Sequence, residues 1–140
     1  MIVDTGGIVA LLNRNDAHHE LVRKCHEQHG RDWVLPWAVL PEIDYLASSR
    51  LGASVAHAFA EDVRDGFFAV DAHVERDLPR ACELLDRYSD LQLGLVDAVV
   101  MAQAERHRAH VILTTDARHF RAVRLKLDRV PRLVPLDPPP

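Results

Sequence analysis

Short apolar runs alternate along the chain with longer segments of helical periodicity. The apolar runs predict strands at residues 1–3, 33–35, 67–70, 111–114 and 133–134. Apolar residues recurring every three or four positions predict helices at 8–12, 16–29, 38–50, 53–64, 74–88, 95–108 and 117–123. This alternation predicts an α/β fold, a mostly parallel sheet covered by helices on both faces. We assign residues 1–134 to one domain and residues 135–140 to a proline-rich C-terminal tail.

Turn residues set the expected helix boundaries. Asp16 is the predicted N-cap of the helix at 16–29, and Gly30 its end. Pro41 fits only the first turn of its helix, because proline has no backbone N–H to donate.

Composition changes this picture little. The chain has 140 residues, of which 48% are hydrophobic and 27% charged, as in ordinary globular domains. No apolar run is long enough to span a bilayer, and no charged leader precedes the first strand. The two cysteines give no disulfide framework. We therefore expect a cytoplasmic protein with no membrane partner.

The charge is uneven, although the net charge is only −4. Basic residues dominate the C-terminal third: Arg106, Arg108, Arg118, Arg121, Arg124, Lys126, Arg129 and Arg132. These arginines are candidates for holding a nucleic-acid backbone, since guanidinium groups bind phosphates bidentately. The alternative is a solvated surface of mixed charge.

Two aspartates occupy equivalent places at strand ends. Asp4 follows the strand at 1–3, and Asp116 follows the apolar run that ends with Thr114. Right-handed crossovers place the carboxyl ends of parallel strands on one rim, where ligands of such sheets bind. We therefore expect Asp4, Thr114 and Asp116 to meet there.

Two further acids lie on helices. Asp97 is in the first turn of the helix at 95–108, where simple dipole compensation is the structural alternative. Glu42 shares a predicted apolar stripe with Ile43 and Tyr45, so its burial would require a metal or an arginine partner. Taken together, clustered carboxylates predict a hard cation, Mg²⁺ or Mn²⁺. Such an ion activates water for hydrolysis of phosphodiesters.

These residues carry a resemblance to a known family. The segments MIVDTGGIVALLN, LPWAVLPEIDYLASSRLG and RYSDLQLGLVDAVVMAQAERHRAHVILTTDARHF resemble the PIN-domain nucleases, and among them the VapC toxins of bacterial toxin–antitoxin pairs. The resemblance covers nearly the whole chain. It implies a three-layer α/β/α sandwich on a central parallel sheet.

The resemblance also implies roles for the site residues. Asp4 and Asp97 match acids that bind the metal directly, and Glu42 and Asp116 match acids that act through metal-bound water. Thr114 matches a polar residue that supports the site.

The implied activity is endonucleolytic cleavage of RNA, either tRNA or a ribosomal RNA loop. A VapB-type antitoxin and a homodimer are the implied protein partners. Trp37 and Tyr45 are candidates for such a protein-binding surface, with Trp37 the more exposed; ordinary core packing is the alternative. One departure is Gly6, where many family members carry serine or asparagine.

Three other interpretations remain open. His18, Cys25 and His29 could share a helical face and bind zinc, although paired close-spaced ligands are missing. A phosphoacceptor receiver domain also clusters acids, but it needs a lysine beside them. A catalytically idle PIN module would act only by binding its antitoxin and operator DNA.

Overall fold

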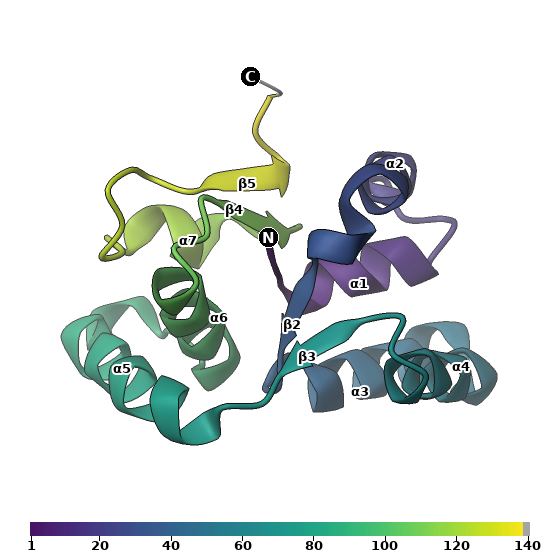
Figure 1. The fold of residues 1–140 in the computed structure, drawn as a ribbon, viewed down its shortest axis with the longest axis horizontal. Coiled ribbons are helices and arrows are strands. Elements are labelled where there is room, and N and C mark those ends of the chain that lie inside the picture. The colour runs from purple at the N-terminus through teal and green to yellow at the C-terminus, as the bar shows by residue number, and fades with distance from the viewer. Residues whose placement is uncertain (139–140) are drawn as a thin grey trace.

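The computed structural model describes residues 1–138 and contains a five-stranded, all-parallel sheet in the order β3-β2-β1-β4-β5 (Figure 1). The strands are β1 (Ile2–Val3), β2 (Val34–Pro36), β3 (Ala69–Asp71), β4 (Val111–Thr114) and β5 (Arg132–Pro135). The buried strand β1 lies at the centre, and pairs Ile2 with Ile112 of β4. The predicted fifth strand is therefore present, and the sheet is parallel throughout.

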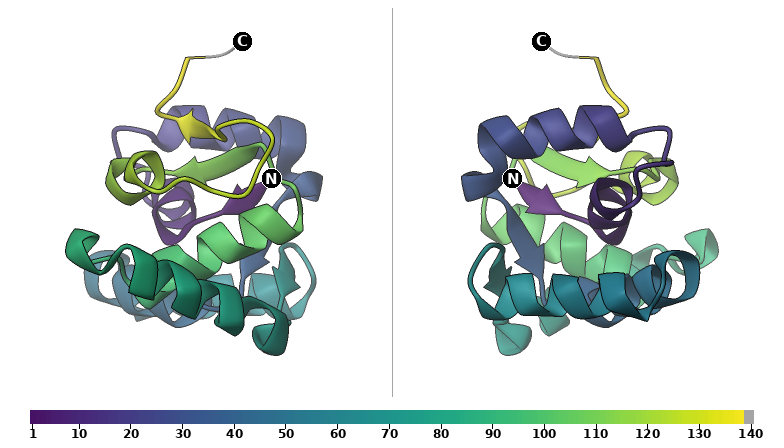
Figure 2. Two further views of the ribbon diagram at one scale, coloured as in Figure 1. Left: turned by 90° about the vertical axis from the view of Figure 1, so that its left-hand side faces the viewer. Right: turned by 90° about the vertical axis from the view of Figure 1, so that its right-hand side faces the viewer.

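Helices cover both faces of the sheet. They are α1 (Thr5–Leu12), α2 (His19–His29), α3 (Val39–Leu51), α4 (Ala53–Arg64), α5 (Val74–Arg87), α6 (Leu95–Arg106) and α7 (Arg118–Ala122), with 3₁₀ turns η1 (Gly30–Asp32) and η2 (Ser89–Leu91). Helices α1–α4 lie on one face and α5–α7 on the other (Figures 1 and 2). The predicted three-layer α/β/α sandwich is thus confirmed.

The strand order produces a switch point at the centre of the sheet. The chain steps outward from β1 through β2 to β3, and then crosses back to β4 on the other side of β1. Because crossovers are right-handed, the helices between β1 and β3 lie on one face of the sheet and those after β3 lie on the opposite face. The carboxyl ends of β1 and β4 therefore border the crevice where ligands of open α/β sheets bind.

Some boundaries differ from the sequence prediction. Helix α2 begins at His19, because the Asp16 carboxylate accepts the N–H of His18 at 2.8 Å in a turn before the helix. The predicted N-cap role of Asp16 is therefore wrong. Pro41 lies in the first turn of α3, as expected.

The predicted boundary between the domain and its C-terminal tail, at residues 134 and 135, falls inside strand β5. Pro135 belongs to β5, and the Asp137 carboxylate accepts the N–H of Leu133 at 2.7 Å. The expected tail at 135–140 is therefore folded back against β5 as far as Asp137, while residues 139–140 lie outside the described part.

No helix within residues 1–138 is long and apolar enough to cross a membrane.

Candidate active site

Asp4 lies at the carboxyl end of β1, directly before α1. Its N–H donates to the carbonyl oxygen of Leu113 at 2.9 Å, which continues the pairing of β1 with β4. Its Oδ1 accepts the N–H of Thr5 at 2.8 Å and caps α1. This cap explains why α1 begins at Thr5 and not at the predicted residue 8. Asp4 is only 7% exposed, so its carboxylate is fixed by burial as well as by hydrogen bonds.

Thr114 connects the two aspartates at the strand ends. It is fully buried at the end of β4, and its hydroxyl donates to Asp4 Oδ2 at 2.7 Å. The same oxygen accepts the backbone N–H of Asp116 at 3.1 Å. Asp4, Thr114 and the backbone of Asp116 therefore meet at the rim, whereas the Asp116 carboxylate is bound by Arg118.

Asp97 is the third residue of α6 and faces helix α7. Its Oδ2 lies 2.6 Å from Nδ1 of His119, and both side chains are about one-quarter exposed (26% and 27%). The helix N-cap is Gly94, and no side chain caps it. The carboxylate of Asp97 therefore serves a tertiary contact and not a capping bond.

Glu42 lies in the first turn of α3, but its environment differs from the prediction. Glu42 is exposed, and Tyr45 is 70% exposed, so the apolar stripe does not include either residue. The buried face of α3 consists of Val39, Ile43 and Ala47. Solvation, and not a compensating partner, therefore makes the Glu42 charge tolerable.

The electrostatics place three acids near one another. The pKa of Asp4 is raised to about 6, mainly by burial and also by the negative charges of Asp97 and Glu42, although the hydrogen bonds from Thr114 and Thr5 oppose this rise. Coulomb interactions weaken with distance, and the charges of both Asp97 and Glu42 affect the pKa of Asp4. Both acids therefore lie within electrostatic reach of Asp4.

Asp116 has the opposite environment. The Arg118 guanidinium holds its carboxylate through Nε, at 3.0 Å from both oxygens, and through Nη2 at 2.5 Å from Oδ2. Hydrogen bonds from this guanidinium and from the Arg118 backbone N–H lower the pKa of Asp116 to about 2. Asp116 is therefore ionised at all ordinary pH values.

The four acids offer the all-oxygen donor set that hard divalent cations prefer. As placed, no three His, Cys, Asp or Glu side chains within residues 1–138 are close enough together to hold a metal ion. Asp116 is turned toward Arg118 and Asp97 toward His119. The donor chemistry thus fits Mg²⁺ or Mn²⁺, with Asp4 and Asp97 as candidate ligands, but these two contacts compete with a cation.

The other metal and phosphoacceptor interpretations gain no support. His18, Cys25 and His29 form no group that could hold zinc in the described part of the chain. A receiver domain needs a lysine beside the acids, but the ammonium group of Lys126 lies 3.7 Å from Glu83.

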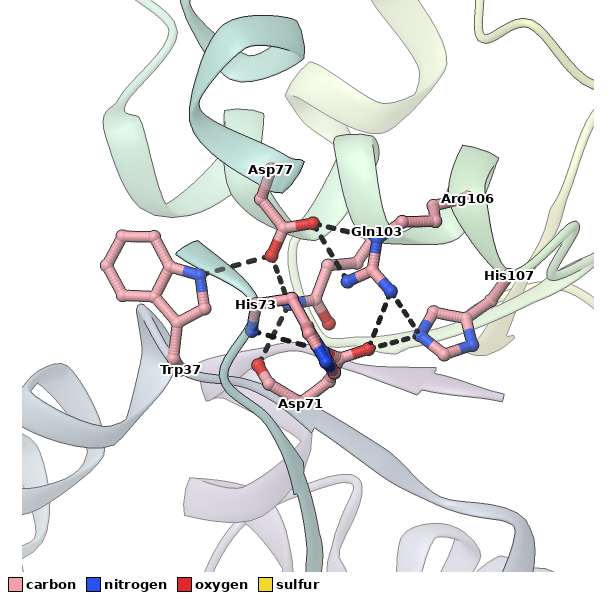
Figure 3. Close-up of polar contacts among 7 residues, drawn as sticks. All are labelled: Trp37, Asp71, His73, Asp77, Gln103, Arg106 and His107. Carbon is pink, nitrogen blue, oxygen red and sulfur yellow. Dashed lines mark hydrogen bonds and ion pairs between the residues drawn. The ribbon is translucent and has the colours of Figure 1, made fainter. Parts of the chain in front are cut away.

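A second polar cluster, not found by the sequence analysis, joins β3 to α5 and α6 (Figure 3). We call it the Asp77 network: Trp37, Asp71, His73, Asp77, Gln103, Arg106 and His107. Asp77 is 1% exposed and accepts hydrogen bonds from three side chains. These donors are the Trp37 indole at 3.1 Å, the Gln103 amide at 2.6 Å and the Arg106 guanidinium at 2.9 and 3.0 Å.

Asp71 is the second carboxylate of the Asp77 network. It contacts His73 Nδ1 at 2.7 Å, His107 Nε2 at 2.6 Å and Arg106 Nη1 at 2.9 Å. Burial opposes ionisation of Asp71, but the hydrogen bonds from Arg106 and both histidines outweigh it and hold the pKa well below its usual range.

The Asp77 network is separate from the acidic site. Arg106 follows Asp97 by nine residues on α6, which corresponds to about 13 Å along the helix. Trp37 is half-buried because its indole reaches Asp77, so the prediction that it is the more exposed aromatic residue is wrong. A signal was present in the sequence, since Asp77 is in helical phase with the buried Ala81 and Leu84.

Several of the basic side chains expected to hold RNA have acidic partners. Arg106 belongs to the Asp77 network, Arg121 contacts Asp137 at 2.8 Å, and Lys126 lies beside Glu83. Within the basic C-terminal set, the exposed arginines with no ion pair among the contacts of residues 1–138 are Arg108, Arg124 and Arg129.

Comparisons with known proteins agree with this fold. Residues 1–126 match the PIN domain family. Ribonuclease VapC26 of Mycobacterium tuberculosis is 29% identical over 124 residues, which cover 89% of this chain and 92% of that protein. The crystal structure of M. tuberculosis VapC20, described as a sarcin-ricin loop cleaving toxin, aligns with a TM-score of 0.76 and 23% identity over 90% of this chain and 97% of the other.

FitAcB from Neisseria gonorrhoeae aligns with a TM-score of 0.59 and 16% identity, over 86% of this chain and 91% of that one. The family match covers most of the chain, and the solved structures share its sheet and helix layers. The VapC relatives agree with the nuclease predicted from the sequence. The chain therefore belongs to the PIN domain family.

Proposed function

We propose that this protein is a divalent-metal-dependent endoribonuclease that acts as the toxin of a VapBC-type toxin–antitoxin pair. The observation that carries the proposal is the environment of Asp4. A buried carboxylate, held by Thr114, lies within electrostatic reach of Asp97 and Glu42 at the switch point of the sheet. A divalent cation bound there would offset the repulsion among these carboxylates and favour the ionised form of Asp4.

Asp4 and Asp97 are the proposed direct ligands of Mg²⁺ or Mn²⁺. When bound, the ion supplies a water of lowered pKa and polarises a phosphoryl oxygen. Glu42 and Asp116 accept hydrogen bonds from water and orient it for in-line attack on phosphorus. Thr114 keeps the Asp4 carboxylate in one orientation through its hydroxyl. Cleavage by water leaves a 5′-phosphate and a 3′-hydroxyl, and it does not use the RNA 2′-hydroxyl.

The proposed substrate is a structured RNA, either tRNA or ribosomal RNA. Single-stranded loops are the usual targets of sequence-specific RNA recognition, because their bases can be splayed out of the stack. VapC20 is described as cleaving the sarcin-ricin loop, so this loop is the first ribosomal target to test. Arg108, Arg124 and Arg129 are the proposed contacts to the RNA backbone.

The proposed protein partners are a VapB-type antitoxin and a second copy of this chain. VapC26 and VapC20 carry the name of the toxin component, which supports the antitoxin assignment. The exposed ring of Tyr45, one turn after Glu42 on α3, remains a candidate for such an interface. The cytoplasm, where the RNA substrates are, is the proposed location.

The test is incubation of purified, antitoxin-free protein with total bacterial RNA, with Mg²⁺, with Mn²⁺ and with EDTA. Asp4→Asn is the matched control, because it keeps the size of the side chain and removes its charge. We expect discrete cuts that require metal and are lost in the variant, with ends mapped by primer extension. Products with 2′,3′-cyclic phosphates would contradict the mechanism. Folded protein that cuts no RNA with either metal would favour the idle binding module.

A further inference from the structure

Two consecutive residues at the start of α7 each hold a different acid of the site. Arg118 binds Asp116 through its guanidinium, and His119 binds Asp97 through Nδ1 at 2.6 Å. Both acids belong to the proposed metal site, and both are drawn toward α7. Arg118 carries a permanent positive charge, since guanidinium groups do not lose their proton in proteins.

The Arg118 contact is strong in geometry but open to exchange. It uses two guanidinium nitrogens on both carboxylate oxygens, yet the side chains of Arg118 and Asp116 are 82% and 49% exposed. Exposed ion pairs contribute little free energy because water screens them. A divalent cation that takes up Asp116, directly or through water, can therefore displace Arg118.

We infer that Arg118 is an exchangeable counter-cation of the acidic site, which holds Asp116 until a divalent metal binds and then turns to a phosphate of the RNA. This inference rests on the proposed nuclease function. It makes Arg118 a substrate-binding residue only in the metal-loaded protein.

The inference predicts effects of opposite sign on metal and RNA. Removing the Arg118 side chain eliminates a competitor for Asp116, so metal affinity rises. It also removes a positive charge that reaches the phosphate, so RNA affinity in the presence of metal falls. A residue with a purely structural role would weaken both, because a distorted site binds neither ligand well.

The metal experiment titrates Mn²⁺ into wild-type protein and Arg118→Ala, with free Mn²⁺ counted by electron paramagnetic resonance at one fixed pH. We expect Arg118→Ala to bind Mn²⁺ about two- to fivefold more tightly, the range that displacement of an exposed ion pair allows. Arg121→Ala is the matched control, because Arg121 lies one turn later on α7 and pairs with Asp137, outside the site. Its Mn²⁺ affinity should equal that of the wild type.

The RNA experiment measures binding of a hydrolysis-resistant phosphorothioate oligoribonucleotide by fluorescence anisotropy, in Mn²⁺ and in EDTA. Arg118→Ala should lose about two- to fivefold in affinity with Mn²⁺ and almost nothing with EDTA, where Arg118 stays on Asp116. Thermal unfolding confirms that both variants are folded, as expected for exposed side chains.

Each other outcome overturns the inference. An unchanged or weaker Mn²⁺ affinity in Arg118→Ala would mean that the arginine does not compete for Asp116. An equal loss of RNA affinity in Mn²⁺ and EDTA would mean that it is not released by metal. If the wild type still binds Mn²⁺ and cleaves RNA, these results reject the role of Arg118 as an exchangeable counter-cation and leave the proposed nuclease function intact. Absence of Mn²⁺ binding by wild type and variant would reject the metal site of the proposed function as well.

Discussion

Thr114 and Asp4, from two different strands, are joined by a 2.7 Å hydrogen bond from the threonine hydroxyl to Oδ2. A hydroxyl has one hydrogen, and Asp4 Oδ2 lies nearer to the Thr114 oxygen than its second acceptor, the Asp116 carbonyl at 3.2 Å. The lone pairs of Thr114 accept the N–H of Asp116, so one side chain contacts both the Asp4 carboxylate and the Asp116 backbone.

Replacing Thr114 by valine tests this arrangement. Thr114→Val keeps the shape of the buried side chain, but it leaves Asp4 Oδ2 and the Asp116 N–H without their partner. We expect a loss of about 1–3 kcal/mol in the free energy of unfolding, measured by urea titration at pH 7. Thr114→Ser keeps the hydroxyl and is the control. Equal stability of the valine and wild-type proteins would show that the hydroxyl is dispensable.

The raised pKa of Asp4 predicts a pH-dependent stability. Burial raises this pKa from its ordinary value of 3.8 to about 6. The folded state thus favours the neutral acid, and its stabilising contribution is complete below pH 4 and lost as pH rises through 6. At pH 7.5 the ionised carboxylate destabilises the fold by about 1–3 kcal/mol, taking each pKa unit as about 1.4 kcal/mol.

Asp4→Asn removes this charge at every pH. We expect the variant to be more stable than the wild type at pH 7.5, and the difference to shrink as pH falls toward 4.5. Thermal unfolding of both proteins across this range gives the comparison, and Asp44→Asn on the exposed face of α3 is the control. A wild type that is more stable at pH 7.5 would contradict the raised pKa.

Local signals explain which boundaries could be predicted from the sequence. The helix at 53–64 was predicted at its observed bounds, because Gly52 and Gly66 flank it with positive φ angles of 105° and 81°. The predicted start of α1 at residue 8 is wrong, because Gly6 and Gly7 belong to the helix. Their small size instead lets the helix pack against β4, where a Cβ on Gly7 would lie 2.6 Å from the Leu113 side chain.

The positions of the acids could be predicted from the sequence, but the residues that contact them could not. The strand-end positions of Asp4 and Asp116 follow from topology, which an alternating pattern determines. The partners of these acids do not follow, because hydrogen bonds such as Asp97–His119 depend on how α6 and α7 pack. The Asp77 network was missed for the same reason, since its members come from segments far apart in the sequence.

Arg106 is the only guanidinium of the Asp77 network, and it contacts both carboxylates. Arg106→Met would leave Asp71 and Asp77 buried without an arginine, and removing one partner of a buried pair is strongly destabilising. Because the Arg106 side chain is 24% exposed, we expect a loss of about 2–4 kcal/mol in urea unfolding. Arg76→Met, at an exposed position of α5, should change the stability by less than about 0.5 kcal/mol. Similar values for the two variants would mean that the network is not held by Arg106.

The Thr115 side chain occupies the space that a side chain at Gly6 would need. A Cβ built on Gly6 overlaps the Thr115 hydroxyl oxygen and lies 3.2 Å from the Thr115 backbone nitrogen. Gly6→Ala should therefore destabilise the protein by forcing Thr115 to rotate. Thr115→Ala removes the hydroxyl, so the double variant should recover about 0.5–2 kcal/mol relative to the sum of the single changes.

Thermal and urea unfolding of the four proteins give this coupling energy. Gly7→Ala is the contrasting control, because its Cβ would meet Leu113 and not Thr115. Thr115→Ala should therefore give no relief to Gly7→Ala, and the two losses should add. If the losses of Gly6→Ala and Thr115→Ala also add, residue 115 does not fill the space beside Gly6. A measured coupling would instead show that the Thr115 side chain fills the space beside Gly6.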